Sequence, residues 1–159
     1  MTKDKILNIS DLIEKIKTWK QAGLKVVFTN GCFDILHLGH IDYLEKARHL
    51  GDKLVVGLNS DSSVRRLKGV ERPINPEYAR ARVLAALEFV DAVCVFEEDT
   101  PKSLIEKIYP DILTKGSDYT LENIVGADFV MSYGGQVKTI DLVEGFSTTQ
   151  ILDKAKNSL

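Results

Sequence analysis

Short, continuous apolar runs alternate with helix-forming segments from residue 25 onward, and this alternation constrains the fold more than any other feature of the chain. Runs such as residues 26–28 and 54–58 have no polar side chain, which is typical of strands buried on both faces. Strands of this kind joined by helices form a parallel sheet covered on both sides. We therefore predict an α/β fold, a Rossmann-like doubly wound parallel sheet in a single domain of residues 25–159, with residues 1–24 as a helical extension packed on it.

The same patterns place the individual elements. The first helix is expected to start at a Ser10 or Asp11 cap, and the helix after the third strand at a Thr100 cap with Pro101 in its first position. Alanine, arginine and leucine, which are strong helix formers, indicate a further helix between the second and third strands. Strands are predicted over residues 26–29, 53–58, 92–96, 111–114 and 136–142, and helices over residues 10–22, 39–50, 76–89, 101–108 and 148–155.

The composition narrows the class of protein. The chain has 159 residues, of which 44% are hydrophobic and 28% charged, so one domain with a full core is expected. Its formal net charge of -2 provides no basic footprint for nucleic acid. No apolar run approaches the roughly 20 residues that span a bilayer, and the first residues lead into an amphipathic segment rather than a signal core. We expect a cytoplasmic protein with neither a nucleic-acid nor a membrane partner.

Glycines, hydroxyls, histidines and basic residues gather directly after the predicted strands. The sequence His37-Leu38-Gly39-His40 lies where the first strand hands over to a helix, and free backbone N–H groups at such a junction favour phosphate. Because the carboxyl ends of parallel strands meet at one edge of a sheet, these loops should converge on a triphosphate pocket. The candidates are Thr29, Asn30, Gly31, Cys32, Phe33 and Asp34 after the first strand, Asn59, Asp61, Arg65, Arg66, Lys68 and Arg72 after the second, Lys115, Gly116 and Asp118 after the fourth, and Gly145, Ser147, Thr148 and Thr149 after the last.

Each group also has a simpler structural interpretation. The late hydroxyls could only cap the last helix, the basic residues could form a solvated loop, and Lys115 could lie in a turn. Cys32 is expected to be a small filler residue and, like Cys94, a free buried thiol. No third ligand at metal-binding spacing accompanies His37 and His40, so no metal held by protein side chains is predicted.

The His-x-Gly-His motif, together with Gly-Phe-Ser-Thr-Thr at the start of the last helix, resembles the signature of the cytidylyltransferase-like nucleotidyltransferase superfamily. Within it, the chain is similar to the adenylyltransferase half of bifunctional ADP-heptose synthases over roughly residues 25–153. This resemblance implies the nucleotidylyltransferase fold. It also implies transfer of AMP from ATP to D-glycero-β-D-manno-heptose 1-phosphate, giving ADP-heptose and pyrophosphate for lipopolysaccharide-type heptose biosynthesis. The likeness is carried by residues 28–40, 56–61, 65–69, 72–75, 115–119 and 142–149.

The implied reaction assigns roles to these residues. The attacking phosphate is already largely dianionic at neutral pH, so charge stabilisation matters more than a general base. His37, His40 and Lys68 are then the catalytic donors, with Lys68 in a loop between the α-phosphate and the sugar phosphate. Nucleotide binding falls to Thr29, Asn30, Gly31, Cys32, Phe33, Gly39, Lys115, Gly116, Asp118, Gly145, Ser147, Thr148 and Thr149, and substrate binding to Asp34, Asn59, Asp61 and Arg72.

The resemblance also implies a cofactor and partners. Mg²⁺ is expected on ATP, held by phosphate oxygens and water. A homodimer is expected, and a separate sugar kinase upstream, because the bifunctional enzymes carry a kinase domain that this chain does not show. Related cytidylyltransferases have an arginine where Val143-Glu144 stands here, so no arginine contact is transferred from them. Two other functions stay open: a cytidylyltransferase acting on an alditol phosphate such as glycerol 3-phosphate, and a nucleotide-binding module without catalysis.

Overall fold

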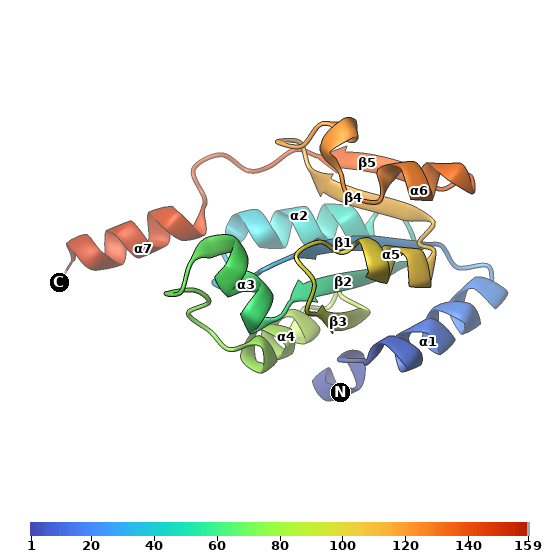
Figure 1. Ribbon diagram of the computed structural model, residues 1–159, viewed down its shortest axis with the longest axis horizontal. Helices are drawn as coiled ribbons and strands as arrows, with labels where there is room; N and C mark the ends of the chain where they lie inside the picture. The colour runs from blue at the N-terminus through green and yellow to red at the C-terminus, as the bar shows by residue number, and fades with distance from the viewer. Residues whose placement is uncertain (159) are drawn as a thin grey trace.

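A five-stranded parallel sheet in the order β3-β2-β1-β4-β5 forms the centre of the molecule (Figure 1). The computed structural model describes residues 1–158. From β1 the chain moves outward to β3 and then returns to place β4 on the other side of β1, so the strand order reverses between β1 and β4. Ligands bind at such a reversal, outside the carboxyl ends of the strands. The strands are β1 (Val26–Gly31), β2 (Lys53–Asn59), β3 (Ala92–Phe96), β4 (Ile112–Gly116) and β5 (Gln136–Ile140).

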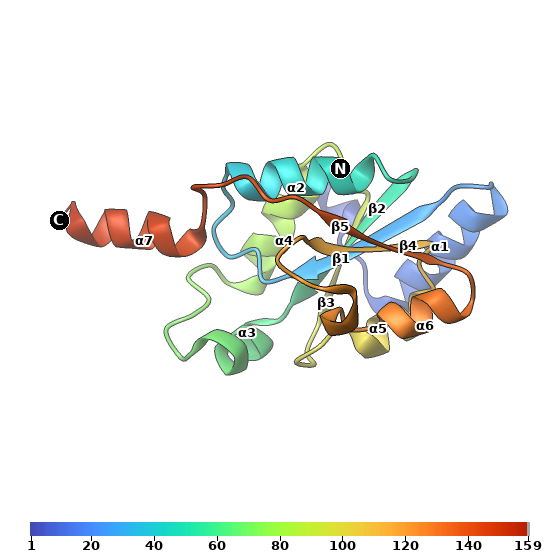
Figure 2. The ribbon, with the colours of Figure 1, turned by 90° about the horizontal axis from the view of Figure 1, so that it is seen from above.

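Helices cover both faces of the sheet (Figure 2). Neighbouring residues of β1 point in opposite directions: Val27 joins a core cluster with Leu44 and Leu84, whereas Phe28 joins a cluster with Leu12 and Ile105. The sheet is therefore sandwiched between two apolar layers, as its continuous apolar strands predict. The helices are α1 (Ile9–Gln21), α2 (Leu38–Arg48), α3 (Asp61–Lys68), α4 (Glu77–Ala86), α5 (Lys102–Ile108), α6 (Ala127–Ser132) and α7 (Thr148–Asn157), with short 3-10 turns η1 (Thr2–Lys5) and η2 (Leu121–Asn123).

The predicted doubly wound sheet is confirmed, but two helices were not predicted. Residues 61–68 were expected to be a loop and instead form α3, because the Ser60 hydroxyl accepts a hydrogen bond from the Ser63 N–H at 3.1 Å and caps the helix. The short helix α6 follows Gly126 at a left-handed φ of 86°. Lys68 is thus the last residue of a helix rather than part of a loop.

Several predicted boundaries are wrong, among them the end of α2, which is Arg48 rather than residue 50, and the end of β5, which is Ile140 rather than residue 142. The cap of α1 is Asn8, whose side chain accepts from the Asp11 N–H at 2.9 Å, so neither Ser10 nor Asp11 is the cap. Helix α5 begins after Pro101 without a side-chain cap, which removes Thr100 from that role. Helix α4 ends at Ala86 rather than at residue 89, because the next residue is extended.

The N-terminal segment packs on the rest of the chain. Leu12 and Ile16 of α1 are buried in the core, and the Leu7 N–H donates to the Val93 carbonyl at the edge of the sheet. At the other end α7 projects away from the sheet, and none of its residues is buried (Figures 1 and 2). None of the helices within residues 1–158 is long and apolar enough to cross a membrane.

Candidate active site

A cavity of about 580 Å³ opens at the carboxyl ends of the strands, where the strand order reverses. The loops after all five strands contribute to it, and so do the starts of α2 and α7. The predicted convergence of these loops is therefore confirmed. The predicted site residues that line the cavity are Asn30, Gly31, Cys32, Phe33, Asp34, His37, Gly39, His40, Asn59, Lys68, Arg72, Lys115, Gly116 and Thr148.

The other predicted site residues lie outside this lining: Thr29, Asp61, Arg65, Arg66, Asp118, Gly145, Ser147 and Thr149. Thr29 is fully buried beneath the floor, where its hydroxyl shares a hydrogen bond of 2.8 Å with the Tyr43 hydroxyl. Asp61 pairs with the Arg80 guanidinium at 2.8 Å. The hydroxyl of Ser147 caps α7 by accepting from the Gln150 N–H at 3.1 Å.

The turn between β1 and α2 is shaped by close contacts with glycine. Phe33 adopts a left-handed φ of 44°, and a Cβ on Gly31 would come within 2.9 Å of its ring. A Cβ on Gly39 would lie 3.0 Å from the His37 imidazole. Any larger residue at these two positions would displace a ring that lines the cavity.

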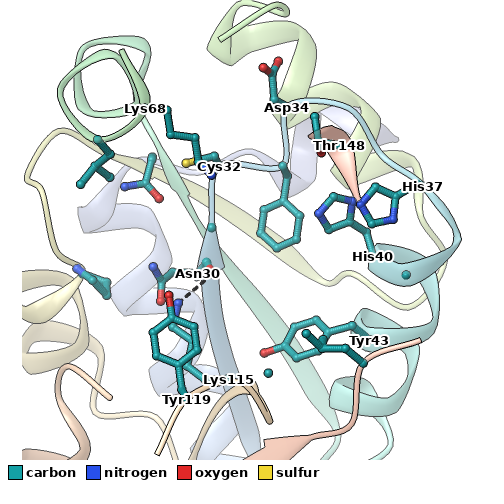
Figure 3. Close-up of a pocket in the computed structure, with 18 of the residues that line it drawn as sticks. Asn30, Cys32, Asp34, His37, His40, Tyr43, Lys68, Lys115, Tyr119 and Thr148 are labelled. Carbon is teal, nitrogen blue, oxygen red and sulfur yellow. Dashed lines mark hydrogen bonds between the residues drawn. The ribbon is translucent and has the colours of Figure 1, made fainter. Parts of the chain in front are cut away.

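His37 and His40 form a stacked pair at the start of α2. Their ring centroids are 3.9 Å apart at 30°, and the Phe33 ring centroid lies 5.3 Å from that of His40. Figure 3 shows the two imidazoles next to each other. Burial, together with the nearby charges of His37 and Lys68, lowers the pKa of His40 to about 4. Burial also lowers the pKa of His37. Both rings are therefore neutral at physiological pH, with one N–H each.

Neither imidazole has a hydrogen-bond partner within the described part of the chain, and both Nδ1 atoms are buried. A buried N–H without an acceptor is rarer than an unused lone pair, so the ring proton is best placed on Nε2. The Oδ1 atom of Asn30 is also buried and has no partner among these residues. Unsatisfied polar groups that gather at one cavity mark the place of a ligand.

Two lysines bring positive charge to the cavity. The Lys115 ammonium donates to the Asn30 carbonyl at 3.3 Å and lies 5.2 Å from the Tyr119 ring. Burial lowers the pKa of Lys115 to about 8, so it is still mostly charged at neutral pH. Lys68, at the end of α3, lies across the cavity from the two imidazoles (Figure 3). The cavity thus combines neutral N–H donors with two ammonium groups.

The acidic residues that line the cavity are already paired. Asp34 binds Arg72 at 2.8 Å and Asp99 binds Arg66 at 2.7 Å. Within residues 1–158 no group of three or more histidine, cysteine, aspartate or glutamate side chains is placed to hold a metal ion.

Sequence reasoning missed several residues at the site. Arg80 is fully buried and binds the carbonyls of Cys32 and Asn59 at 2.6 and 2.8 Å. A signal for Arg80 was present, because it precedes the apolar Leu84 of the same helix by four residues and so shares its buried face. Arg80 supports the cavity from behind its lining. The unpredicted residues that line the cavity itself are Tyr43, Leu67, Asp99, Thr100, Pro101, Asn123 and Val125, whereas Tyr119, Leu142, Val143 and Phe146 belong to the segments 115–119 and 142–149 that carry the resemblance.

The parallel sheet, the paired histidines at a helix start and the converging lysines define a nucleotidyltransferase. The chain belongs to the cytidylyltransferase-like family, whose model matches residues 28–153, so the predicted family is confirmed. "Bifunctional protein HldE" from Mesorhizobium japonicum is 58% identical over 97% of the chain, and the protein of that name from Geotalea uraniireducens is 56% identical over 96%. The chain spans 31% of the length of each.

Solved structures support the same fold. A lipopolysaccharide core biosynthesis protein from Thermoplasma volcanium GSS1 is 33% identical, with a TM-score of 0.62 over 76% of this chain and 98% of that chain. A pantoate-beta-alanine ligase from Francisella tularensis is 16% identical, with a TM-score of 0.64 over 95% of this chain and 76% of that chain. The second likeness concerns the fold alone.

Proposed function

We propose that this chain transfers AMP from ATP to D-glycero-β-D-manno-heptose 1-phosphate, forming ADP-heptose and pyrophosphate. The observation that carries the proposal is the pair of neutral imidazoles, His37 and His40, without partners at the start of a helix and across the cavity from Lys68. The similarity to the HldE proteins, and the resemblance to ADP-heptose synthases, support the choice of donor and acceptor.

The reaction needs no general base. A phosphate oxygen of the sugar phosphate attacks the α-phosphorus of ATP, and a new P–O bond forms while the bond to the bridging α–β oxygen breaks. The electron pair of that bond leaves with pyrophosphate. Because the attacking phosphate is already largely dianionic at neutral pH, the protein has to manage charge and position rather than remove a proton.

The histidines serve this purpose as hydrogen-bond donors. Neutral rings with the proton on Nε2 donate to the α-phosphate oxygens and to the leaving pyrophosphate, on which negative charge develops. The positive end of α2 adds to this stabilisation, because His37 is the N-cap residue of that helix. Such donors are fixed before the reaction begins, so no reorganisation is needed at the transition state.

The remaining groups hold the two substrates. Lys68 lies opposite the histidines, where it can contact both the α-phosphate and the sugar phosphate. Thr148 at the start of α7 lines the cavity, and we assign it to the outer phosphates. Apolar Leu142 and Val143 line the part of the cavity near the ends of β4 and β5 and suit the adenine ring.

Mg²⁺ would enter with ATP. The carboxylates at the cavity are engaged by arginines, so phosphate oxygens and water are its natural ligands here. When bound, the ion neutralises part of the triphosphate charge and helps the pyrophosphate leave.

The proposed reaction has consequences for the enzyme that supplies its acceptor, for the compartment and for the partners of the chain. Its acceptor carries an anomeric phosphate, which must be installed by phosphoryl transfer, and we assign this step to a sugar kinase activity. The reaction also uses ATP and therefore belongs in the cytoplasm. A homodimer is proposed because α7 projects from the sheet with Ile151 exposed, and light scattering at several concentrations tests it.

Pyrophosphate release tests the choice of substrates. The wild-type protein is supplied with ATP or CTP, each with heptose 1-phosphate or glycerol 3-phosphate. We expect turnover with ATP and heptose 1-phosphate to exceed the other three combinations. Faster release from CTP with glycerol 3-phosphate would favour the cytidylyltransferase alternative, and no release from any pair would favour a binding module.

A further inference from the structure

Asp34 is the most deeply buried charged group that lines the cavity, and it is fully occupied. Only 1% of its side chain is exposed. Its carboxylate accepts hydrogen bonds of 2.8 Å from the Ile74 and Asn75 N–H groups and from Nε of Arg72. The Asn75 side-chain amide donates to the Asp34 carbonyl at 2.8 Å. Asp34, in the loop after β1, thus fixes the C-terminal part of the loop that joins α3 to α4.

These contacts leave Asp34 unsuited to bind a substrate. In Figure 3 its carboxylate points away from the cavity. Burial raises the pKa of this carboxyl, but the Asn75 and Ile74 N–H groups and the Arg72 guanidinium outweigh burial, so the pKa is below its ordinary value. Asp34 is therefore ionised at neutral pH and bound to its three donors.

Arg72 is in the opposite situation, because only part of its guanidinium is used. Nε binds Asp34, whereas the two terminal nitrogens make no hydrogen bond with residues 1–158. The side chain is 17% exposed and lines the cavity. A guanidinium held at one edge is fixed in its plane, and its free edge presents two parallel N–H donors that match phosphate geometry.

We infer that Asp34 is a positioning residue that acts through Arg72: it holds the guanidinium so that its two free nitrogens receive the phosphate of the acceptor. The inference rests on the proposed function for the identity of that acceptor. It replaces the prediction that Asp34 itself binds substrate. Arg72 and the exposed Lys68 then have different roles. The guanidinium held by Asp34 orients the phosphate of the acceptor, and the less constrained ammonium of Lys68 stays in contact with that phosphate during transfer.

Holding Arg72 in advance favours binding for two reasons. The long side chain loses its conformational freedom on folding rather than when the acceptor arrives. The acceptor also carries about two negative charges and must approach the triphosphate, so a fixed positive group in its path lowers the electrostatic barrier.

A double-mutant cycle tests the inference. Asp34→Asn, Arg72→Ala and the double variant are compared with wild type in kcat/KM for the sugar phosphate, in KM for ATP and in thermal unfolding. We expect each single variant to lose about 10- to 100-fold in kcat/KM for the acceptor, as for a lost charged hydrogen bond. The double variant should be no worse than Arg72→Ala, because Asp34 has nothing left to position. KM for ATP should stay within about twofold.

Glu71→Gln is the matched control. Glu71 is an exposed carboxylate next to Arg72 that does not line the cavity, so its variant should keep wild-type constants. A further loss when Asp34→Asn is added to Arg72→Ala would show that Asp34 acts independently and would overturn the inference. An equal rise in KM for ATP and for the acceptor would overturn it as well.

Arg72→Lys keeps the test decisive if Asp34→Asn does not fold. A lysine has one ammonium group and cannot bind Asp34 and present two further donors to a phosphate. We expect it to lose as much activity toward the acceptor as Arg72→Ala, and full activity in Arg72→Lys would contradict the inference. The acceptor in all assays is the one that wild type uses fastest. Turnover by wild type with another acceptor would change the proposed function alone, whereas no turnover with any acceptor would remove both.

Discussion

The two walls of the cavity treat their polar groups in opposite ways. On the wall formed by the start of α2, the imidazoles of His37 and His40 are neutral and have no hydrogen-bond partner within the described residues. On the wall formed by the loops after β1 and β2, Asp34 and Arg80 are charged, buried and bound on every side. The wall at the start of α2 therefore has hydrogen-bond donors available to a ligand. The wall formed by the loops after β1 and β2 uses the contacts of Asp34 and Arg80 to hold the shape of the cavity.

Arg80 illustrates the frame. Its guanidinium donates to the carbonyls of Asn75, Cys32 and Asn59 at 3.0, 2.6 and 2.8 Å, and to the Asp61 carboxylate at 2.8 Å. These four partners lie in three separate segments: the loop after β1, the junction between the end of β2 and the start of α3, and the loop before α4. Each segment contributes residues to the cavity. A single buried cation therefore fixes three segments of the wall, whereas no comparable contact fixes the imidazoles.

The comparison teaches how to separate binding groups from structural groups. A buried charge with all its hydrogen bonds made gains nothing from a ligand, while an unpaired donor at a cavity gains a full hydrogen bond. Removal of an imidazole from the open wall should therefore impair turnover directly. On the closed wall, removal of Arg80 should impair stability, whereas removal of Asp34 should impair turnover through the position of Arg72.

The largest effect is expected from His40→Ala. It removes a donor to the charge that develops in the transition state, so kcat should fall about 10³-fold while the affinity for ATP falls less. Initial rates of pyrophosphate release, together with calorimetric titration of ATP, separate the two effects. Equal losses in both would show that the imidazole serves ground-state binding only.

Arg80→Gln should break the closed wall. It leaves Asp61 without its cation and three carbonyls without their donor, so the free energy of unfolding should fall by about 3 kcal/mol. Urea denaturation measures the loss. Arg82→Gln on the same helix is the control, because the Arg82 bond to the Tyr78 hydroxyl is exposed and should contribute less than about 1 kcal/mol. A similar loss of unfolding free energy in both variants would show that the buried hydrogen bonds of Arg80 stabilise the fold no more than the exposed bond of Arg82.

Lys68→Ala should lower turnover at least roughly 100-fold, which is the usual effect of losing one charged transition-state donor. Because Lys68 is exposed at the end of α3, the thermal stability of the Lys68→Ala variant should be close to that of wild type. The measurement is kcat at saturating substrates, together with thermal unfolding. Near-normal turnover would remove Lys68 from the mechanism.

The sheet and its helices follow from the sequence because β1, β2 and β3 carry unbroken apolar runs and helix-forming segments separate the strands. The helix α3 could not be predicted in this way, since only Ser63 and Val64 are buried in it and it has no apolar stripe. Its stability comes from the Ser60 cap and from contacts with other loops, which a local pattern does not display.

The site was predictable to the extent that it depends on strand ends. All loops that follow strands converge as expected, and the histidines lie where the motif indicates. What could not be predicted is how side chains are shared between binding and support. Asp34 and Arg80 bind mainly backbone groups from distant loops, and only the folded chain brings those groups together.

The neutral state of His40 predicts a pH dependence of stability. Burial lowers its pKa to about 4, whereas the unfolded chain keeps a value near 6.5, so between these values the unfolded chain binds more protons. The free energy of unfolding should therefore be highest above pH about 6.5 and decrease as the pH falls toward about 4. Urea denaturation across this range should show a flatter profile for His40→Ala. The exposed His49 supplies the control, and a His49→Ala profile as flat as that of His40→Ala would contradict the assignment.

The smallest effect is expected from Cys32→Ser. The thiol lines the cavity, but burial raises its pKa, so it is a neutral filler at physiological pH rather than a nucleophile. Pyrophosphate release should stay within about threefold of wild type, since a hydroxyl replaces the thiol with little change in shape. A folded but inactive variant, with normal thermal unfolding, would give the thiol a chemical role.

Adenylyl transfer to a sugar phosphate is the central claim, and phosphorus NMR of the wild-type reaction tests it most directly. ATP, Mg²⁺ and D-glycero-β-D-manno-heptose 1-phosphate are mixed with the protein, and the signals are followed with time. We expect ATP and the sugar phosphate to decline together while pyrophosphate and a nucleoside diphosphate sugar appear in equal amounts. Appearance of ADP with inorganic phosphate, or an unchanged spectrum from a folded protein, would contradict it.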